Sequence, residues 1–228
     1  MPSKKLATKF LKIVFLLIYF LTLYVPLFEK VNITPQVRTV SAANFVIQTG
    51  AYVGNGNVMS ISGLGFAPDL VILKAHSTAG SGGLFKTSST IDNISLMFSA
   101  TADSRGTITL DPDGFTVVGT NANTATAYYT WIAFGGSDCS SSGNFCVGTY
   151  VGDGTNPRLI NTGFQPDLVW VKMTGAYDTT WRSSDMPDNY AQYFSAVAQS
   201  TDGSSFTTLS STGFNVGATN NTASAIYY

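Results

Sequence analysis

One sequence unit of about 99 residues occurs twice in this chain of 228 residues. Residues 50–56 (GAYVGNG) recur as residues 148–154 (GTYVGDG), and residues 66–71 (FAPDLV) recur as residues 164–169 (FQPDLV). Both matches are offset by 98 positions, without a gap between them. A register held over so long a stretch does not arise from composition, and solenoid units are only about 20–50 residues long. The unit therefore has the length of an independent domain.

The match continues to the last residues of the chain. The later matches, now at an offset of 99, are Gly114-Phe115 with Gly213-Phe214, and Tyr128-Tyr129 with Tyr227-Tyr228. We therefore expect two copies of one domain, the first copy at residues 44–138 and the second copy at residues 139–228. The first copy continues beyond its tyrosine pair as TWIAF, whereas the second ends at Tyr228. This predicts that the last strand of the second copy is truncated, with strand donation by a neighbouring chain as the alternative.

Each copy is predicted to be β-structure. Short apolar runs rich in branched and aromatic residues, such as residues 71–74 (VILK) and 168–172 (LVWVK), are separated by turns rich in Gly, Pro, Asn and Asp. Six to eight short strands with a turn every 8–12 residues are typical of a sandwich or jelly roll. The predicted fold class is all-β, with two tandem β-sandwich or jelly-roll domains after an N-terminal hydrophobic signal or anchor helix.

Three motifs support a family resemblance that covers residues 44–228. The string Gly-Phe-x-Pro-Asp-Leu-Val-x-Val-Lys, a later Asp-Gly-Phe-x-Val and a closing Tyr-Tyr-x-Trp-Ile-Ala-Phe resemble a repeat domain of phage tail-fibre and virion proteins, which also occurs in secreted bacterial proteins. This domain is similar to the concanavalin-like jelly-roll sandwiches used for display and glycan contact. The resemblance implies a fold and a display role, and it carries over no catalytic residue.

Residues 1–43 have the pattern of an export segment. Residues 1–12 hold four lysines and no acid, residues 13–28 are uncharged and mostly apolar, and residues 40–43 (VSAA) suit a signal peptidase. The apolar run is shorter than the roughly 20 residues of a spanning helix and contains Pro26. We predict a cleaved signal peptide, with an uncleaved membrane anchor or a buried helix as alternatives. The protein is then secreted or at the cell surface, and it contacts a membrane only through residues 13–28 if these are not removed.

Composition excludes several functions. From residue 44 onward, six Lys and Arg stand against 12 Asp, so this part has no basic stripe for nucleic acid. The chain has one Glu (Glu29) and one His (His76), which excludes a catalytic Glu pair and a helical Glu-x-x-His metal site. We therefore expect no enzyme, no catalytic residue, no cofactor and no bound metal.

The only two cysteines, Cys139 and Cys146, lie at the junction of the two copies. Outside the cytoplasm such a close pair favours a disulfide that pins the junction. Free thiols are the alternative. Zinc is disfavoured because two thiolates without a nearby His fill only half of a tetrahedral site.

The candidate ligand contacts are two aromatic–basic pairs and a nearby acid. The pairs are Phe85-Lys86 and Trp181-Arg182, at similar places in the two copies, and Asp185 follows the second pair. An exposed aromatic ring stacks on a sugar face, while Arg182 and Asp185 offer hydrogen bonds beside it. The alternative is an aromatic ring that fills the core.

Asp69 and Asp167 both follow a proline in the repeated FxPDLV motif. They are interpreted either as ligands for calcium or a sugar, or as turn residues whose carboxylates accept backbone N–H groups. The second interpretation is the simpler one.

The sequence as a whole favours an exported, non-enzymatic repeat protein for surface display or adhesion. Its expected partner is a cell-surface glycan or protein. The alternative is a carbohydrate-binding module of a larger secreted protein.

Overall fold

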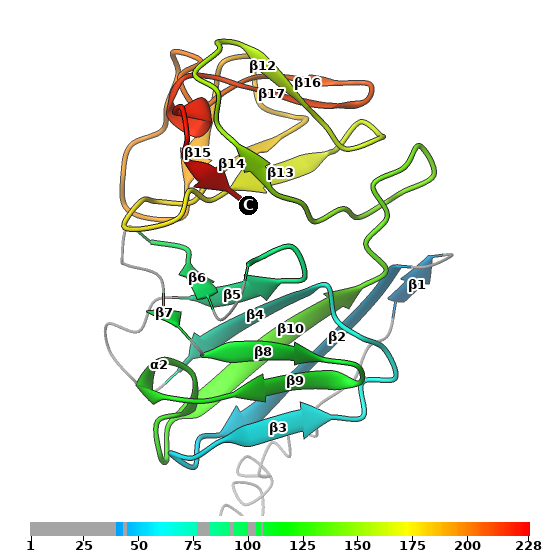
Figure 1. Ribbon diagram of the computed structural model, residues 1–228, viewed down its shortest axis with the longest axis vertical. Helices are drawn as coiled ribbons and strands as arrows, with labels where there is room; N and C mark the ends of the chain where they lie inside the picture. Colours follow the sequence, from blue (N-terminus) through cyan, green and yellow to red (C-terminus); the bar gives the residue numbers. More distant parts are fainter. Residues whose placement is uncertain (1–39, 43–44, 77–82, 92–93, 100–103, 106) are drawn as a thin grey trace, which may run out of the picture. The chain divides into compact units, whose positions relative to one another are not determined.

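The computed structural model describes residues 40–42, 45–76, 83–91, 94–99, 104–105 and 107–228 (Figure 1). The chain divides into two units, residues 1–36 and residues 37–228, and the described residues belong to the second. The predicted signal or anchor at residues 1–43, including its apolar run at residues 13–28, lies outside the described residues except for residues 40–42. Within the described ranges, no helix has the length and apolar character needed to cross a membrane.

The described chain consists almost entirely of antiparallel strands and the turns between them, which confirms the all-β prediction. Strand β1 (Val40–Ala42) precedes the first copy, whose elements are β2 (Phe45–Val53), β3 (Met59–Ser62), β4 (Leu70–Ala75), β5 (Leu84–Thr87), β6 (Ile94–Met97), β7 (Ser104–Arg105), β8 (Ile108–Asp111), β9 (Gly114–Val117), α2 (Thr120–Asn123) and β10 (Tyr128–Gly135). Those of the second copy are β11 (Tyr150–Val151), β12 (Arg158–Asn161), β13 (Leu168–Val171), β14 (Thr180–Ser183), β15 (Gln192–Tyr193), β16 (Phe206–Ser210), β17 (Gly213–Val216), η2 (Thr219–Asn221) and β18 (Ile226–Tyr227).

Two sheets contribute to the core of the first copy. The larger sheet has seven strands in the order β1-β2-β10-β4-β5-β6-β7, and the smaller has the order β3-β9-β8. Side chains alternate between the two faces of a strand, so Tyr129 and Trp131 of β10 lie on the same face as Val71 and Leu73 of β4. Phe115 of the smaller sheet packs edge-on against Trp131, with ring centroids 5.3 Å apart. The apolar faces of the two sheets thus share one core.

The second copy repeats these pairings, and its strands β11, β13, β15 and β18 are shorter than β2, β4, β6 and β10. Its sheets have the orders β13-β14-β15, β12-β17-β16 and β11-β18 (Figure 1). Its core combines Val169 and Val171 of β13, Phe214 and Val216 of β17, and Tyr227 of β18. The sheet order β12-β17-β16 corresponds to β3-β9-β8 of the first copy.

A stacked pair of tyrosines joins the first and last strands of each copy. The ring centroids of Tyr52 and Tyr129 lie 5.0 Å apart, and those of Tyr150 and Tyr227 lie 4.9 Å apart. In both copies the hydroxyl of the second tyrosine accepts a backbone N–H from five residues earlier, at 3.0 Å and 2.9 Å. The match of Tyr129 with Tyr228 made from the sequence is therefore wrong, because the structural equivalent of Tyr129 is Tyr227, at an offset of 98.

The offset changes between strands because the loops differ in length. Gly114 and Gly213 keep the offset of 99: a Cβ added at either one would lie 2.0 Å from the carbonyl oxygen of Ile61 or Ile160, respectively. The paired strands β12 and β17 are thus offset by 99 from their counterparts β3 and β9. Strands β13 and β18 are offset by 98 from β4 and β10. The loops absorb the difference, and the strand pairings stay the same.

A third apolar cluster contains residues of both copies. It includes Leu70 and Phe85 from the larger sheet of the first copy, and Trp170 and Tyr228 from the second copy. Leu70 is adjacent to Val71 in β4 and points to the opposite face, so this cluster lies outside the core of the first copy. Each copy therefore covers part of the other's outer sheet face.

Gly152→Ala is expected to destabilise the second copy. The new Cβ would lie 2.0 Å from the carbonyl oxygen of Thr222, so the backbone would have to move. We expect the free energy of unfolding, measured by urea denaturation, to fall by about 2–3 kcal/mol, as in other overpacked sites. Gly148→Ala is the control, because the space around its Cβ is open, and we expect a change below about 0.5 kcal/mol. Equal losses in the two variants would contradict the close backbone approach.

Candidate functional site

The two aromatic–basic pairs occupy equivalent positions in the two copies. Lys86 pairs with Val71 across β5 and β4, and Arg182 pairs with Val169 across β14 and β13. Val71 and Val169 are matching residues of the repeated FxPDLV motif. The strand register thus agrees with the match made from the sequence, and it places both cations on the inner side of their sheets.

Both cations are buried and hydrogen-bonded to the protein's own backbone. Lys86 is 6% exposed, and its Nζ donates to the carbonyl oxygens of Thr90 and Ile94 at 3.2 Å and 3.0 Å. Arg182 is 2% exposed. Its guanidinium donates to three backbone carbonyls and one carboxylate, those of Met186, Pro187, Tyr190 and Asp188, at distances from 2.7 to 3.1 Å. Each cation therefore organises the segment that follows its own strand.

Arg182→Met is expected to loosen residues 186–190 and lower stability. The change removes the donor to three carbonyls while keeping most of the apolar side-chain volume. We expect a loss of about 2–3 kcal/mol in urea denaturation, because hydrogen bonds from a charged donor contribute about 1.5–3 kcal/mol each and the freed carbonyls regain water in part. Asp188→Asn is the control, because the Asp188 carboxylate is largely exposed and its ion pair contributes little. A larger loss in Asp188→Asn than in Arg182→Met would contradict this role.

The aromatic members of the pairs face the opposite side of the same strands. Phe85 is fully buried and packs against Phe98, with ring centroids 4.7 Å apart, and against Trp170 at 6.4 Å. Trp181 is half-buried, and its ring lies 6.1 Å from that of Phe194, which is 43% exposed. Phe85 thus contributes to the cluster between the copies. Phe194 packs against Phe98 and Trp170 of the same cluster, with ring centroids 4.9 Å and 6.0 Å away, and together with Trp181 it forms the edge of that cluster at the surface.

Asp185, the last of the predicted ligand contacts, lies near Trp181 in the sequence, and Phe194 lies beside Trp181 in the structure. Asp185 is exposed, as a ligand contact requires. Phe194 was not among the predicted residues, because residues 190–200 show no strand alternation and no motif that recurs in the first copy. Beside it, Gln192 pairs with Trp181 across β15 and β14 and donates from Nε2 to Oε1 of Gln199 at 3.0 Å. Trp181, Phe194 and Gln192 are therefore the surface group that the structure brings together.

Asp69 holds the end of β10 in place. Its Oδ2 accepts the backbone N–H of Ser137 at 2.8 Å, and its Oδ1 accepts the hydroxyl of Ser88 at 2.9 Å. These bonds agree with the structural interpretation of this residue. Asp167 has the equivalent backbone contact, in which its carbonyl oxygen accepts the N–H of Ser184 at 2.8 Å, as that of Asp69 accepts the N–H of Ser88. Among the described residues, no hydrogen bond to its carboxylate matches those of Asp69.

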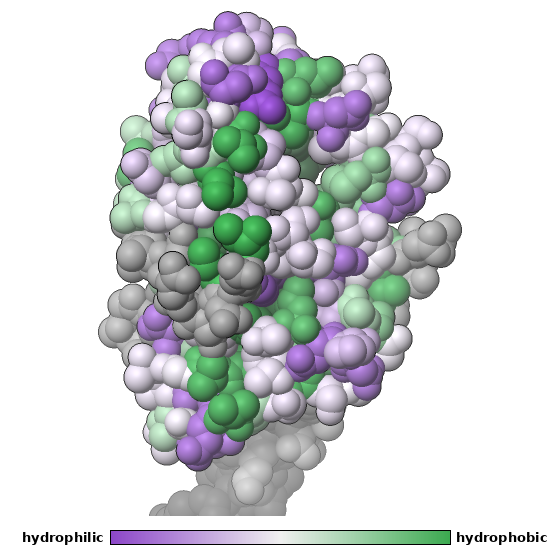
Figure 2. All heavy atoms as spheres, viewed as in Figure 1, coloured by the Kyte–Doolittle hydropathy of each residue, from purple (hydrophilic) through white to green (hydrophobic). Residues whose placement is uncertain are grey.

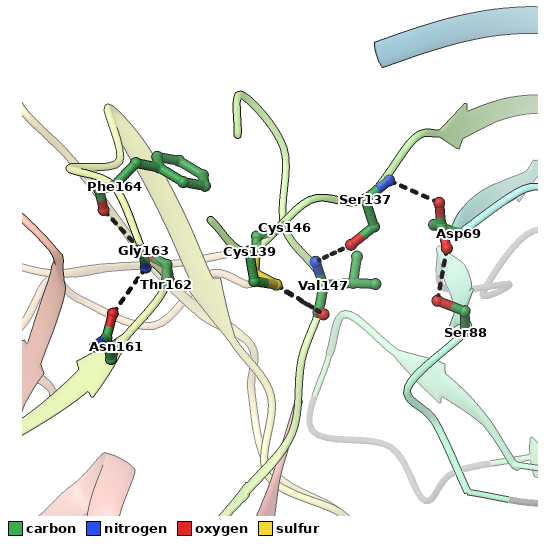
Figure 3. Close-up of a disulfide and its surroundings, with 10 residues drawn as sticks. All are labelled: Asp69, Ser88, Ser137, Cys139, Cys146, Val147, Asn161, Thr162, Gly163 and Phe164. Carbon is green, nitrogen blue, oxygen red and sulfur yellow. Dashed lines mark hydrogen bonds between the residues drawn. A yellow bond between two sulfur atoms is a disulfide. The ribbon is translucent and has the colours of Figure 1, made fainter. Parts of the chain in front are cut away.

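Cys139 and Cys146 form the predicted disulfide, with Cα atoms 5.0 Å apart (Figure 3). Next to it, the Ser137 hydroxyl accepts the backbone N–H of Val147 at 3.0 Å. Figure 3 shows that these bonds continue through Ser137 to Asp69, so the junction is anchored to the first copy. A cross-link over so short a loop contributes about 2–3 kcal/mol by the chain-entropy model. Disulfides are typical of proteins in oxidising compartments.

A second acidic residue holds a turn in the second copy. Asp153 accepts the hydroxyl and the backbone N–H of Thr155, at 2.7 Å and 2.8 Å, and the amide of Asn221 at 2.7 Å. These hydrogen bonds, those from Thr155 first, lower the pKa of Asp153 to about 2. Asn55 takes the same place in the first copy and accepts the amide of Asn123 at 2.9 Å. The acid thus has an uncharged counterpart that shares its backbone and asparagine contacts, whereas Asp153 also accepts a hydroxyl and pairs with Arg158 at 3.3 Å.

Acid is expected to weaken the second copy partly through Asp153. Its pKa is lower in the folded chain than the ordinary value of 3.8, so its stabilising contribution is present above about pH 4 and is lost as the pH falls through about 2. Asp153→Asn introduces the residue of the first copy and should flatten the loss of stability between pH 4 and pH 2. Thermal unfolding followed by circular dichroism over this range measures the slope. Parallel slopes for the variant and the parent would contradict the assignment.

An open hollow in the second copy was not predicted from the sequence. Its volume is about 540 Å³. Its lining is mostly polar and aromatic: Met173, Ala176, Tyr177, Asp178, Thr180, Tyr193, Ala218, Thr219, Asn220 and Thr222. These residues come from segments far apart in the sequence, and no single motif connects them.

In the described part of the chain, no three His, Cys, Asp or Glu side chains are grouped so that they could hold a metal ion. Comparison with protein-family models, with curated proteins and with solved structures gave no match to this chain.

Proposed function

We propose that the chain is an exported, non-enzymatic repeat protein whose two copies are β-sandwiches of the concanavalin-like jelly-roll type, serving surface display or adhesion. In this role the two copies present their outer surfaces to a cell-surface glycan or protein. Residues 1–43 direct the chain out of the cytoplasm as a signal peptide or an anchor.

This proposal rests chiefly on the hydrogen bonds that the two buried cations make to backbone carbonyls. Lys86 and Arg182, at equivalent positions, donate to backbone carbonyls of their own copies. A charged group that is held in this way stabilises a loop and is not presented to a substrate. This arrangement supports a structural unit that was duplicated as a scaffold.

Two further features support an exported display protein. The Cys139–Cys146 disulfide is of the kind that persists in oxidising surroundings. On the face shown in Figure 2, apolar residues lie in separate patches among weakly polar ones, over both copies. The repeated motifs, which resemble those of tail-fibre repeat domains, favour the same role.

A carbohydrate-binding module is the second candidate, because Trp181 and Phe194 reach the surface side by side. Exposed aromatic rings stack on the apolar faces of sugars, and the nearby Gln192 supplies an amide for hydroxyl groups. This candidate keeps the fold and the export of the first, and it adds a defined ligand.

A glycan array distinguishes the two candidates. The full chain is applied beside Trp181→Ala and beside Leu159→Ala, a control that removes another exposed apolar side chain. A module at Trp181 gives saturable binding that falls at least tenfold in Trp181→Ala and is unchanged in the control. Adhesion to a glycan through another surface gives binding that Trp181→Ala leaves unchanged, and adhesion to a protein, or display alone, gives no saturable binding. Release of products from polysaccharides by the purified chain would overturn the non-enzymatic proposal.

A further inference from the structure

Four lining positions of the hollow in the second copy correspond to buried core positions of the first copy. Strand register and shared hydrogen bonds equate four positions: Met173 with Ala75, Thr180 with Leu84, Tyr193 with Met97, and Asn220 with Ala122. In the first copy all four are buried members of one apolar cluster. In the second copy all four line the hollow. The second copy has therefore exchanged apolar core for polar and aromatic lining at one place in the fold.

Two buried polar side chains form part of this lining. Asn220 is 5% exposed and Thr180 is 2% exposed. The Asn220 Nδ2 donates to the Thr180 Oγ1 at 2.8 Å, and among the described residues this is the one side-chain hydrogen bond of Asn220. Its carbonyl oxygen Oδ1 is therefore available to accept a bond from a ligand. The first copy folds with Ala and Leu at these positions, so the fold does not require the polar pair.

The segment beside the hollow is held by a fully buried lysine. The Nζ of Lys172 donates to the carbonyl oxygen of Gly175 at 2.8 Å and to that of Tyr177. This fixes the backbone that carries Tyr177 and Asp178 into the lining. In the first copy the matching Lys74 is exposed. The hydrogen bonds of Lys172 thus hold one side of the hollow in a fixed position. The Tyr177 side chain is 54% exposed beside the opening.

We propose that this hollow binds a neutral saccharide of one or two pyranose units. Its volume lies in the range of small-molecule sites, about 300–1,000 Å³. Tyr177 and Tyr193 supply aromatic surface for the C–H face of a sugar ring, and Asp178, Thr180 and Asn220 supply acceptors and hydroxyls for its hydroxyl groups. Asp178, the one charged side chain in the lining, disfavours an anionic ligand. A purely apolar ligand would leave the polar pair without new partners.

This site differs from the surface group at Trp181, although the inference rests on the carbohydrate-binding candidate for its class of ligand. Thr180 and Trp181 are neighbours in β14 and point to opposite faces of the sheet. Variants at the two positions therefore separate the failure of one site from the failure of the other.

The test is titration of the full chain with lactose, maltose, cellobiose and N,N′-diacetylchitobiose, followed by NMR. We expect saturable shifts of the Thr180, Asn220 and Tyr193 amide signals with at least one disaccharide. The double variant Thr180→Leu with Asn220→Ala introduces the residues of the first copy and should weaken binding at least tenfold. Tyr177→Ala changes an exposed side chain, so it tests the site even if the double variant does not fold. Leu159→Ala, which removes an exposed apolar side chain outside the lining, is the control and should bind as the parent does, and Trp181→Ala reports separately on the surface group.

Three results would overturn the inference. The first is the absence of saturable shifts with all four disaccharides, which would also remove the carbohydrate-binding candidate if the glycan array is silent. The second is unchanged affinity in both the folded double variant and Tyr177→Ala. The third is loss of binding in Trp181→Ala alone, which would leave the carbohydrate-binding candidate standing and move its site to the outer face.

Discussion

Contact between the first and last strands of each copy is the constraint on which the rest of this structure depends. Tyr52 stacks on Tyr129, and Tyr150 stacks on Tyr227, across more than seventy residues of chain. These pairs fix the register of the strands that flank them, and through it the side of the sheet on which each later residue lies. Once this register is set, Lys86 and Arg182 fall on the inner side, and Phe85 and Trp181 fall on the outer side.

Much of the fold could be predicted from the sequence because its signals are local or repeated. Short β-branched and aromatic runs with turns between them indicated an all-β chain, and two close cysteines indicated a disulfide. The correct partner of Tyr129 could also have been read from the sequence, because residues 123–125 (NTA) recur as residues 221–223 at an offset of 98. The repeated tyrosine pair shifted the match by one residue, and the hydrogen bonds from backbone N–H groups to the tyrosine hydroxyls identify Tyr227 as the equivalent residue.

The candidate site was harder to predict, because it depends on contacts between residues that lie far apart in the sequence. Phe85 lies on the outer face of its sheet, and the sequence does not show that the second copy covers that face. Arg182 has the residue type of a ligand contact, but its strand position turns it toward backbone carbonyls. The hollow gathers Thr180, Tyr193 and Asn220 from three separate elements, and each of them is unremarkable in the sequence alone. Comparison of one copy with the other reveals it.

The shared cluster of Leu70, Phe85, Trp170 and Tyr228 has a consequence for how the molecule responds to force or heat. If either copy unfolds, apolar surface of the other copy becomes exposed to water, so we expect the two copies to unfold together. A protein held at one end and attached to a target at the other would then resist load as a single block. It would unfold in one step under load, whereas domains joined by a flexible linker unfold one after the other.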